Sequence, residues 1–140
     1  MNNRYICKAK RKDNGEWVEG DLIQWKNGNM QICLGVGLNK KEKTLVDIIP
    51  ETVGQCTGRK YANDKLLFEG DIVKWYSDYD DTWGYSHTAE CYGVVVWNAN
   101  DYCWNIKTNY ELIPFNDYDW DVSMVVGNIY DNSELLEAER

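Results

Sequence analysis

The chain has 140 residues, which is enough for one ordinary domain or two very small ones. With 44% hydrophobic residues, only 2 prolines and a net charge of -8, its composition is that of an acidic globular protein and excludes disordered and collagen-like chains. The longest apolar run, Gly93 to Trp97, is far too short to span a bilayer, and the first residues lack a signal-peptide core, so we expect a soluble cytoplasmic protein with no membrane contact.

Most of the chain has the pattern of β-strands, with short runs of Trp, Tyr, Val and Ile separated by Asn, Asp and Gly. Two Asn-Gly pairs, at 14–15 and 27–28, predict tight hairpin turns because both residue types tolerate a positive φ. Residues 51–65 and 77–90 show no clear period and are predicted to be polar loops. The predicted strands, in chain order, are Tyr5–Lys10, Glu16–Trp25, Met30–Val36, Thr44–Ile49, Leu66–Trp75, Cys91–Trp97, Tyr102–Thr108 and Asp121–Tyr130.

A short C-terminal helix is predicted, because Ser133 is a good N-cap and Glu134 places a negative charge in the first turn. The fold class that follows is mainly β, with small barrel-like antiparallel sheets and this short helix. We expect a single unit over residues 1–140, and the alternative is a division into two β sub-domains, 1–55 and 56–140.

The segment EGDLIQW, which begins at residue 19, recurs as EGDIVKW at residue 69. Glycine accepts a backbone angle that other residues resist, and an aspartate side chain can bond the neighbouring amides of a tight turn. Gly20 and Asp21, like Gly70 and Asp71, are therefore predicted to form structural turns that lead into a strand. Small barrels of the Src-homology-3 type often enter a strand in this way.

The cysteines predict no metal site and no disulfide framework. The chain has 5 cysteines, widely spaced and without a C-x-x-C pair, and a single histidine. A zinc site or a set of disulfides would need closer, paired spacing. We expect free thiols, mostly buried as small hydrophobic residues in a reducing compartment. They are Cys7, Cys33, Cys56, Cys91 and Cys103.

The charge is unevenly distributed along the chain. Residues 1–70 carry 12 basic and 9 acidic side chains, a net charge of +3, whereas residues 71–140 carry 3 basic and 14 acidic ones, a net charge of -11. The negative electrostatic field of the whole chain, with its net charge of -8, repels phosphate backbones and disfavours nucleic-acid binding. A nucleic-acid-binding small β-barrel is kept as the alternative, because Lys8 to Lys12 and Lys40 to Lys43 could form a basic patch.

Three stretches, at residues 52–58, 68–73 and 125–136, together resemble the YopX family of phage and prophage proteins from Gram-positive bacteria. Thr52–Gly58 is similar to the family's T-V-G-Q-x-T-G element, and Phe68–Val73 is similar to its Y-E-G-D-I-V element. Val125–Leu136 is similar to the ending G-N-I-Y-x-N-P-E-L-L, with Ser133 where proline is usual. The resemblance implies a mainly β protein encoded by a phage and acting in the cytoplasm of its bacterial host. It implies no reaction, so no catalytic residue can be carried over.

Residues that commonly carry catalysis or bind metals are sparse. His87 has no G-x-S-x-G element to accompany it, so a hydrolase triad is not supported. The aspartates at 78, 80 and 81 and those at 117, 119 and 121 lack the glycine and glutamate that a calcium loop requires at its sixth and twelfth positions. We therefore expect no enzyme, no cofactor and no metal, while chelation of a hard cation by alternating aspartates stays open.

Aromatic residues alternate with aspartates in two segments of the acidic half, 78–85 and 117–121. Exposed Tyr and Trp anchor interfaces, and surrounding like charges steer a partner of opposite charge. We predict an accessory protein that acts by binding a host protein, a phage protein or a second copy of itself, rather than by catalysis. Mimicry of DNA and a purely solubilising role for the aspartates are the alternatives. The predicted interface residues are Asp78, Tyr79, Asp80, Asp117, Tyr118, Asp119 and Trp120.

Overall fold

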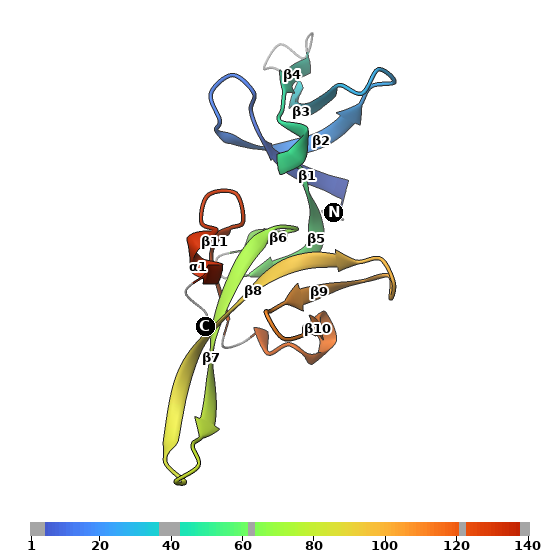
Figure 1. The fold of residues 1–140 in the computed structure, drawn as a ribbon. Helices are drawn as coiled ribbons and strands as arrows, with labels where there is room; N and C mark the ends of the chain where they lie inside the picture. Colours follow the sequence, from blue (N-terminus) through green and yellow to red (C-terminus); the bar gives the residue numbers. More distant parts are fainter. Residues whose placement is uncertain (1–4, 37–42, 62–63, 121–122, 138–140) are drawn as a thin grey trace. The chain divides into compact units, whose positions relative to one another are not determined.

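The computed structural model describes residues 5–36, 43–61, 64–120 and 123–137. The chain divides into two compact units, unit 1 with residues 1–60 and 66–68 and unit 2 with residues 61–65 and 69–140. Each unit is built on one antiparallel sheet (Figure 1), which confirms the mainly β fold class. The sheets do not close into barrels, because their outermost strands pair on one side only within the described residues.

Unit 1 contains a six-stranded sheet in the order β4-β3-β2-β1-β5-β6. Both predicted Asn-Gly turns are confirmed, with φ of 74° at Gly15 and 95° at Gly28. The side-chain oxygens of Asn14 and Asn27 accept hydrogen bonds from the backbone N–H two residues on, at 2.9 and 3.0 Å. The strands are β1 (Ile6–Lys10), β2 (Trp17–Gln24), β3 (Met30–Val36), β4 (Lys43–Asp47), β5 (Gly54–Tyr61) and β6 (Lys65–Phe68).

Strand β5 lies where the sequence predicts a polar loop. It pairs with β1, so that Cys7 lies opposite Gln55. In β5 the buried residues, Gly54 and Cys56, lie only at the end of the strand that pairs with β1, whereas the residues from Gly58 to Lys60 are exposed. A strand with so few buried side chains shows no hydrophobic alternation, and pairing with β1 rather than its own pattern explains its extended structure.

The predicted turn at Gly20 is wrong. Gly20 lies inside β2, opposite Cys7, and its φ is not positive. A Cβ atom at this position would overlap the carbonyl oxygen of Cys33 and lie 2.9 Å from the side chain of Ile32, which belongs to the core of the unit. Asp21 is exposed and pairs with Cys33 in the strand. The glycine is therefore required by the close approach of β3.

We expect Gly20→Ala to lower the free energy of unfolding by about 1–2 kcal/mol, because the added methyl group displaces backbone and core atoms. Urea denaturation of both proteins measures the difference. Asp21→Ala is the matched control at the neighbouring exposed position, and it should change stability by less than about 0.5 kcal/mol. Equal stability of Gly20→Ala and the parent would contradict the close approach.

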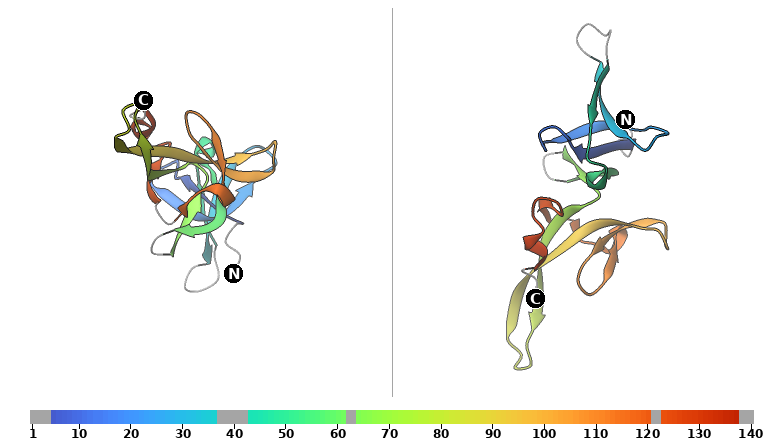
Figure 2. Two further views of the ribbon diagram at one scale, coloured as in Figure 1. Left: turned by 90° about the horizontal axis from the view of Figure 1, so that it is seen from below. Right: turned by 45° about the horizontal axis from the view of Figure 1, so that its top comes forward.

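Unit 2 contains a five-stranded sheet in the order β10-β9-β8-β7-β11. In Figure 1 and in the right panel of Figure 2 the β7–β8 hairpin extends well beyond the other strands of its sheet. The predicted C-terminal helix is confirmed as α1 (Glu134–Glu137). The strands are β7 (Asp71–Asp80), β8 (Ser86–Asn98), β9 (Cys103–Lys107), β10 (Leu112–Pro114) and β11 (Met124–Asn128).

The second copy of the repeated segment does form a turn. Gly70 has φ of 91° and lies between β6 and β7. Its N–H donates to the carbonyl of Val95 at 2.9 Å, and its carbonyl accepts from the N–H of Ile129 at 2.9 Å. Asp71, only 3% exposed, follows as the first residue of β7. The predicted turn at Gly70 is confirmed, so the two copies of the repeat have different structures.

The core of unit 2 lies on both faces of its sheet. Val73, Val95 and Ile106 are fully buried on one face, where the segment 115–120 contacts Trp75. Strand alternation places Ile72, also fully buried, on the opposite face. Helix α1 packs against β8. The long hairpin is therefore anchored at its base by a well-packed sheet.

All five cysteines are free thiols. Cys7 and Cys56 are buried, and the other three are partly buried. This agrees with the expectation of unpaired cysteines that pack as small hydrophobic residues.

Candidate functional site

The part of the β7–β8 hairpin that leaves the sheet is the strongest candidate site, and we call residues 75–91 the arm. β11 pairs with β7 only as far as Lys74, and β9 pairs with β8 only from Val94 onward. Within the arm the two strands pair with each other, from Trp75 opposite Cys91 to Asp80 opposite Ser86. The predicted acidic loop over 77–90 is thus wrong, and most of it is a two-stranded ribbon.

The turn at the tip of the arm is organised by Asp81. One of its carboxylate oxygens accepts the N–H groups of Trp83 and Tyr85, at 2.9 and 3.0 Å. Its backbone N–H donates to the carbonyl of Tyr85 at 2.9 Å, and Gly84 takes up φ of 84°. The second carboxylate oxygen lies 2.7 Å from Nε2 of His87. These bonds fix the conformation of the turn without any packing against the body of the sheet.

The fixed turn presents aromatic side chains to solvent. Trp83 is 84% exposed and Tyr85 is 69% exposed. Just behind them Tyr79 stacks on His87, with the ring centroids 5.3 Å apart. A turn whose backbone is already fixed loses little conformational entropy when its aromatic side chains are buried against a partner. His87 therefore belongs to the arm as a structural partner of Asp81 and Tyr79.

One face of the arm carries carboxylates. Asp78 accepts a hydrogen bond from the hydroxyl of Thr88 at 2.8 Å, and Asp80 accepts one from Ser86 at 2.9 Å. Strand alternation places both on the same face, opposite the face of Tyr79 and His87. The cross-strand hydroxyls orient the two carboxylates but do not neutralise them. The predicted site residues Asp78, Tyr79 and Asp80 are all exposed.

The acidic character diminishes toward the base of the arm. Glu90 lies 3.2 Å from the ammonium of Lys74 and accepts a hydrogen bond from the hydroxyl of Tyr92 at 3.1 Å. These two hydrogen bonds lower the pKa of Glu90, the one from Lys74 more than the one from Tyr92. Hydrogen bonds with Tyr76 and then Glu90 raise the pKa of Lys74. The uncompensated negative charge of the arm is therefore concentrated near the tip, at Asp78 and Asp80.

The pKa of Asp81 is lowered, above all by its hydrogen bond with His87 and also by the N–H of Tyr85. A carboxylate of this kind stabilises the fold above its unfolded-state pKa of about 3.8, and the contribution is lost as pH falls through the folded-state value. We expect Asp81→Asn to be less stable than the parent at neutral pH, and this difference should be smaller at about pH 2, well below the unfolded-state pKa. Urea denaturation at both pH values tests this, and a difference that is undiminished in acid would contradict it.

The second predicted interface segment, 117–121, has a different role. Tyr118 is only 7% exposed, so it belongs to the core rather than to a surface. Its ring meets those of Trp75 and Trp120 edge to face, with centroids 5.1 and 4.6 Å away, and its hydroxyl lies 2.6 Å from that of Ser123. Burial raises the pKa of Tyr118 to about 12. An interface role for Tyr118 requires an exposed ring, and the structure does not provide one.

The other residues of this segment surround the buried tyrosine. Trp120 is partly buried, contacts Phe115 and donates from its indole Nε1 to the carbonyl of Phe115 at 3.1 Å. Asp117 and Asp119 are exposed, and Asp121 lies outside the described residues. The segment therefore supports the base of the arm through Trp75, while Trp83 and Tyr85, the most exposed aromatic residues of the arm, lie at the other end of the ribbon.

The basic cluster of unit 1 is largely engaged within the unit. The ammonium of Lys8 lies over the rings of Trp17 and Phe68, at 5.0 and 5.1 Å, and that of Lys10 lies 5.5 Å from the ring of Trp17. Arg11 forms a two-bond ion pair with Asp13. The side chains of Lys40 to Lys43 lie outside the described residues. Phosphate groups would have to compete with these contacts.

No cluster of metal-ligating side chains occurs among the residues that the structure describes. In the same residues, no helix combines the length and the apolar character that crossing a membrane requires.

The comparisons with known proteins decide the family. A family model described as YopX protein matches residues 8–137. The chain belongs to the YopX family. No curated protein and no solved structure matches it.

The stretches that resemble YopX proteins have structural roles here. The Thr52 hydroxyl accepts the N–H of Lys10 at 2.9 Å and donates to the carbonyl of Ile49 at 2.7 Å. The Asn128 side chain accepts the N–H groups of Tyr130 and Asp131, which forms the turn between β11 and α1. These YopX-like elements hold strands and turns in place, whereas the arm lies outside all three of them.

Proposed function

We propose that this YopX-family protein is a phage-encoded accessory protein that binds another protein through its arm and catalyses no reaction. The observation that carries the proposal is the tip, where Trp83 is 84% exposed on a turn that Asp81 holds rigid. Interfaces draw most of their binding energy from a few aromatic anchors of this kind. We further propose that it acts in the cytoplasm of the bacterial host.

A basic protein surface is the partner that suits the arm. Asp78 and Asp80 lie within the same ribbon as the exposed aromatics, and no cation among the described residues pairs with them. Residues 71–140, which make up most of unit 2, also carry a net charge of -11. Long-range attraction then raises the rate of encounter, and burial of the aromatics slows dissociation.

Self-association is a second form of the same proposal, because residues 1–70 carry a net charge of +3 and could receive the arm of another copy. Nucleic-acid binding is less favoured. The lysines of β1 lie over aromatic rings, and the exposed aromatics of the arm are accompanied by carboxylates rather than by lysines or arginines. A strand of phosphates would be repelled at the same place where its bases would have to stack.

The test is capture of partners from a bacterial host lysate with the full chain. We expect Trp83→Ala combined with Tyr85→Ala to lose the partner, or to abolish self-association in light scattering, while the melting temperature stays within about 2 °C because both rings are exposed. Tyr110→Ala is the matched control, since Tyr110 is an equally exposed aromatic on the turn after β9. It should bind as the parent does.

Binding should also weaken as salt is raised, and Asp78→Asn with Asp80→Asn should remove much of that salt dependence. Identical capture and identical scattering by the parent and the tip variant would overturn the proposal. A DNA shift that the tip variant abolishes would favour the nucleic-acid alternative instead.

A further inference from the structure

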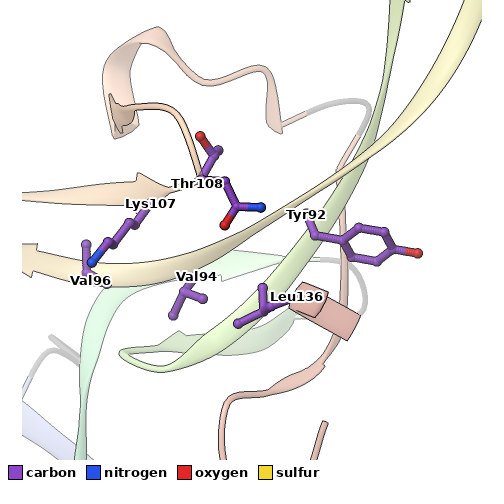
Figure 3. A pocket seen from close by; sticks show the side chains of 7 residues that line it. Tyr92, Val94, Val96, Lys107, Thr108 and Leu136 are labelled. Carbon is purple, nitrogen blue, oxygen red and sulfur yellow. The ribbon is translucent and has the colours of Figure 1, made fainter. Parts of the chain in front are cut away.

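A pocket of about 280 Å³ lies on the face of the unit 2 sheet against which α1 packs (Figure 3). Val94 and Val96 of β8 and Leu136 of α1 form its apolar part, and Tyr92 lies at the end toward the arm. Lys107, opposite Val94 at the end of β9, contributes a cation to its rim. The volume is close to the lower limit of about 300 Å³ for ligand pockets, so it suits one small apolar group with an adjoining polar one.

Lys107 is one of the few basic side chains in the acidic half of the chain. Residues 71–140 contain three basic side chains, Lys74, Lys107 and Arg140, against 14 acidic ones. Lys74 is paired with Glu90, and Arg140 lies outside the described residues. Lys107 makes no ion pair or side-chain hydrogen bond with any described residue, even though acidic side chains outnumber basic ones in residues 71–140. A cation that has no acidic partner among the described residues, at the rim of an apolar pocket, is complementary to an apolar group that carries a carboxylate.

The edge of β8 next to the pocket is open. β9 covers this edge only from Val94 onward, so within the described residues no strand pairs with it from Ser86 to Gly93. An isolated two-stranded ribbon is only marginally stable in water, and a third strand would satisfy the free backbone groups of the edge. A peptide that runs beside β8 in the same direction would have its C-terminus next to Lys107.

From these three features we infer that the pocket binds the C-terminal residue of a partner polypeptide. Its apolar side chain packs against Val94, Val96 and Leu136, its terminal carboxylate pairs with Lys107, and the preceding residues add a strand to the open edge of β8. The inference rests on the proposed function, since it names the form of the protein partner. The small apolar lining of Val94, Val96 and Leu136 matches a single amino-acid side chain, which is why one residue is the occupant.

NMR titrations of the isotope-labelled full chain, followed through its backbone amide signals, test the pocket with defined probes. The probes are N-acetyl-leucine, N-acetyl-leucinamide, and a short lysine-containing peptide ending in leucine with either a free or an amidated C-terminus. We expect both free acids to shift the amides of Val94, Lys107 and Leu136. The two probes without a free carboxylate, N-acetyl-leucinamide and the amidated peptide, should bind about fivefold more weakly than the free acids. A loss of this size is expected for a carboxylate–lysine pair at a partly exposed site. Only the peptides should also shift the β8 amides from Ser86 to Gly93.

Lys107→Gln should abolish the preference for the free carboxylate, while Lys26→Gln, at an exposed lysine in the turn before β3, should keep it. Leu136→Ala should weaken all the probes. No shift at the pocket, or an unchanged preference in Lys107→Gln, would overturn the inference. Shifts from N-acetyl-leucine without any effect of the peptide on Ser86 to Gly93 would overturn it too, since they indicate a site for small acids. The tip variant leaves these titrations unaffected, so a failure of the arm proposal is distinguished from a failure of the pocket.

Discussion

Replacing Tyr118 by alanine should lower the free energy of unfolding by about 3–4 kcal/mol, the usual cost of deleting a large buried aromatic side chain. The ring is 7% exposed and lies edge to face with Trp75 and Trp120. The substitution removes both aromatic contacts and leaves a cavity where the segment 115–120 covers the sheet. Urea denaturation followed by tryptophan fluorescence measures the loss, because two of the affected residues are tryptophans.

Two controls separate the ring from its surroundings. Tyr118→Phe keeps the ring and loses only the bond between the hydroxyls of Tyr118 and Ser123, so it should cost about 1 kcal/mol. Asp119→Lys changes an exposed charge next to the ring, and it should alter stability by less than about 0.5 kcal/mol. A Tyr118→Ala protein as stable as the parent would show that the ring is a surface group, as its position between two aspartates suggests.

Local signals predicted the turns and the helix but not the arm. Asn14-Gly15 and Asn27-Gly28 determine their turns by residue chemistry alone, and α1 begins directly after Ser133, as its preference for the N-cap position predicts. Ser77 to Asp80 and Ser86 to Glu90 are exposed on both faces over most of their length, so they show no alternation of apolar and polar residues. A strand of this kind resembles a polar loop in sequence, and only its pairing partner reveals it.

Features that depend on tertiary packing cannot be predicted from the sequence. The two copies of the repeat share four of their seven residues, yet Gly20 lies inside a strand because β3 approaches it, and Gly70 lies in a turn between β6 and β7. Tyr118 is buried because a distant residue, Trp75, lies against it. The pocket at Lys107 combines side chains from β8, β9 and α1, which no spacing in the chain connects.

Gly70→Val should lower the free energy of unfolding by about 3 kcal/mol, from backbone strain together with crowding. At φ of 91° a β-branched residue is strained whatever space surrounds it. A Cβ atom there would lie 3.5 Å from the ring of Tyr130 and 3.6 Å from the side chain of Ile129, so the additional methyl groups of valine have little room. The strain would also disturb the hydrogen bonds that Gly70 makes with Val95 and Ile129.

Gly28→Ala isolates the effect of the backbone angle. Gly28 has nearly the same φ, 95°, but no atom lies within 4 Å of the added Cβ. The cost there should be about 1 kcal/mol, so Gly70→Val should be the less stable variant by about 2 kcal/mol in urea denaturation. If the two variants proved equally stable, the space around Gly70 would be larger than the structure shows. If Gly70→Val matched the parent, the turn between β6 and β7 would have to adopt another conformation.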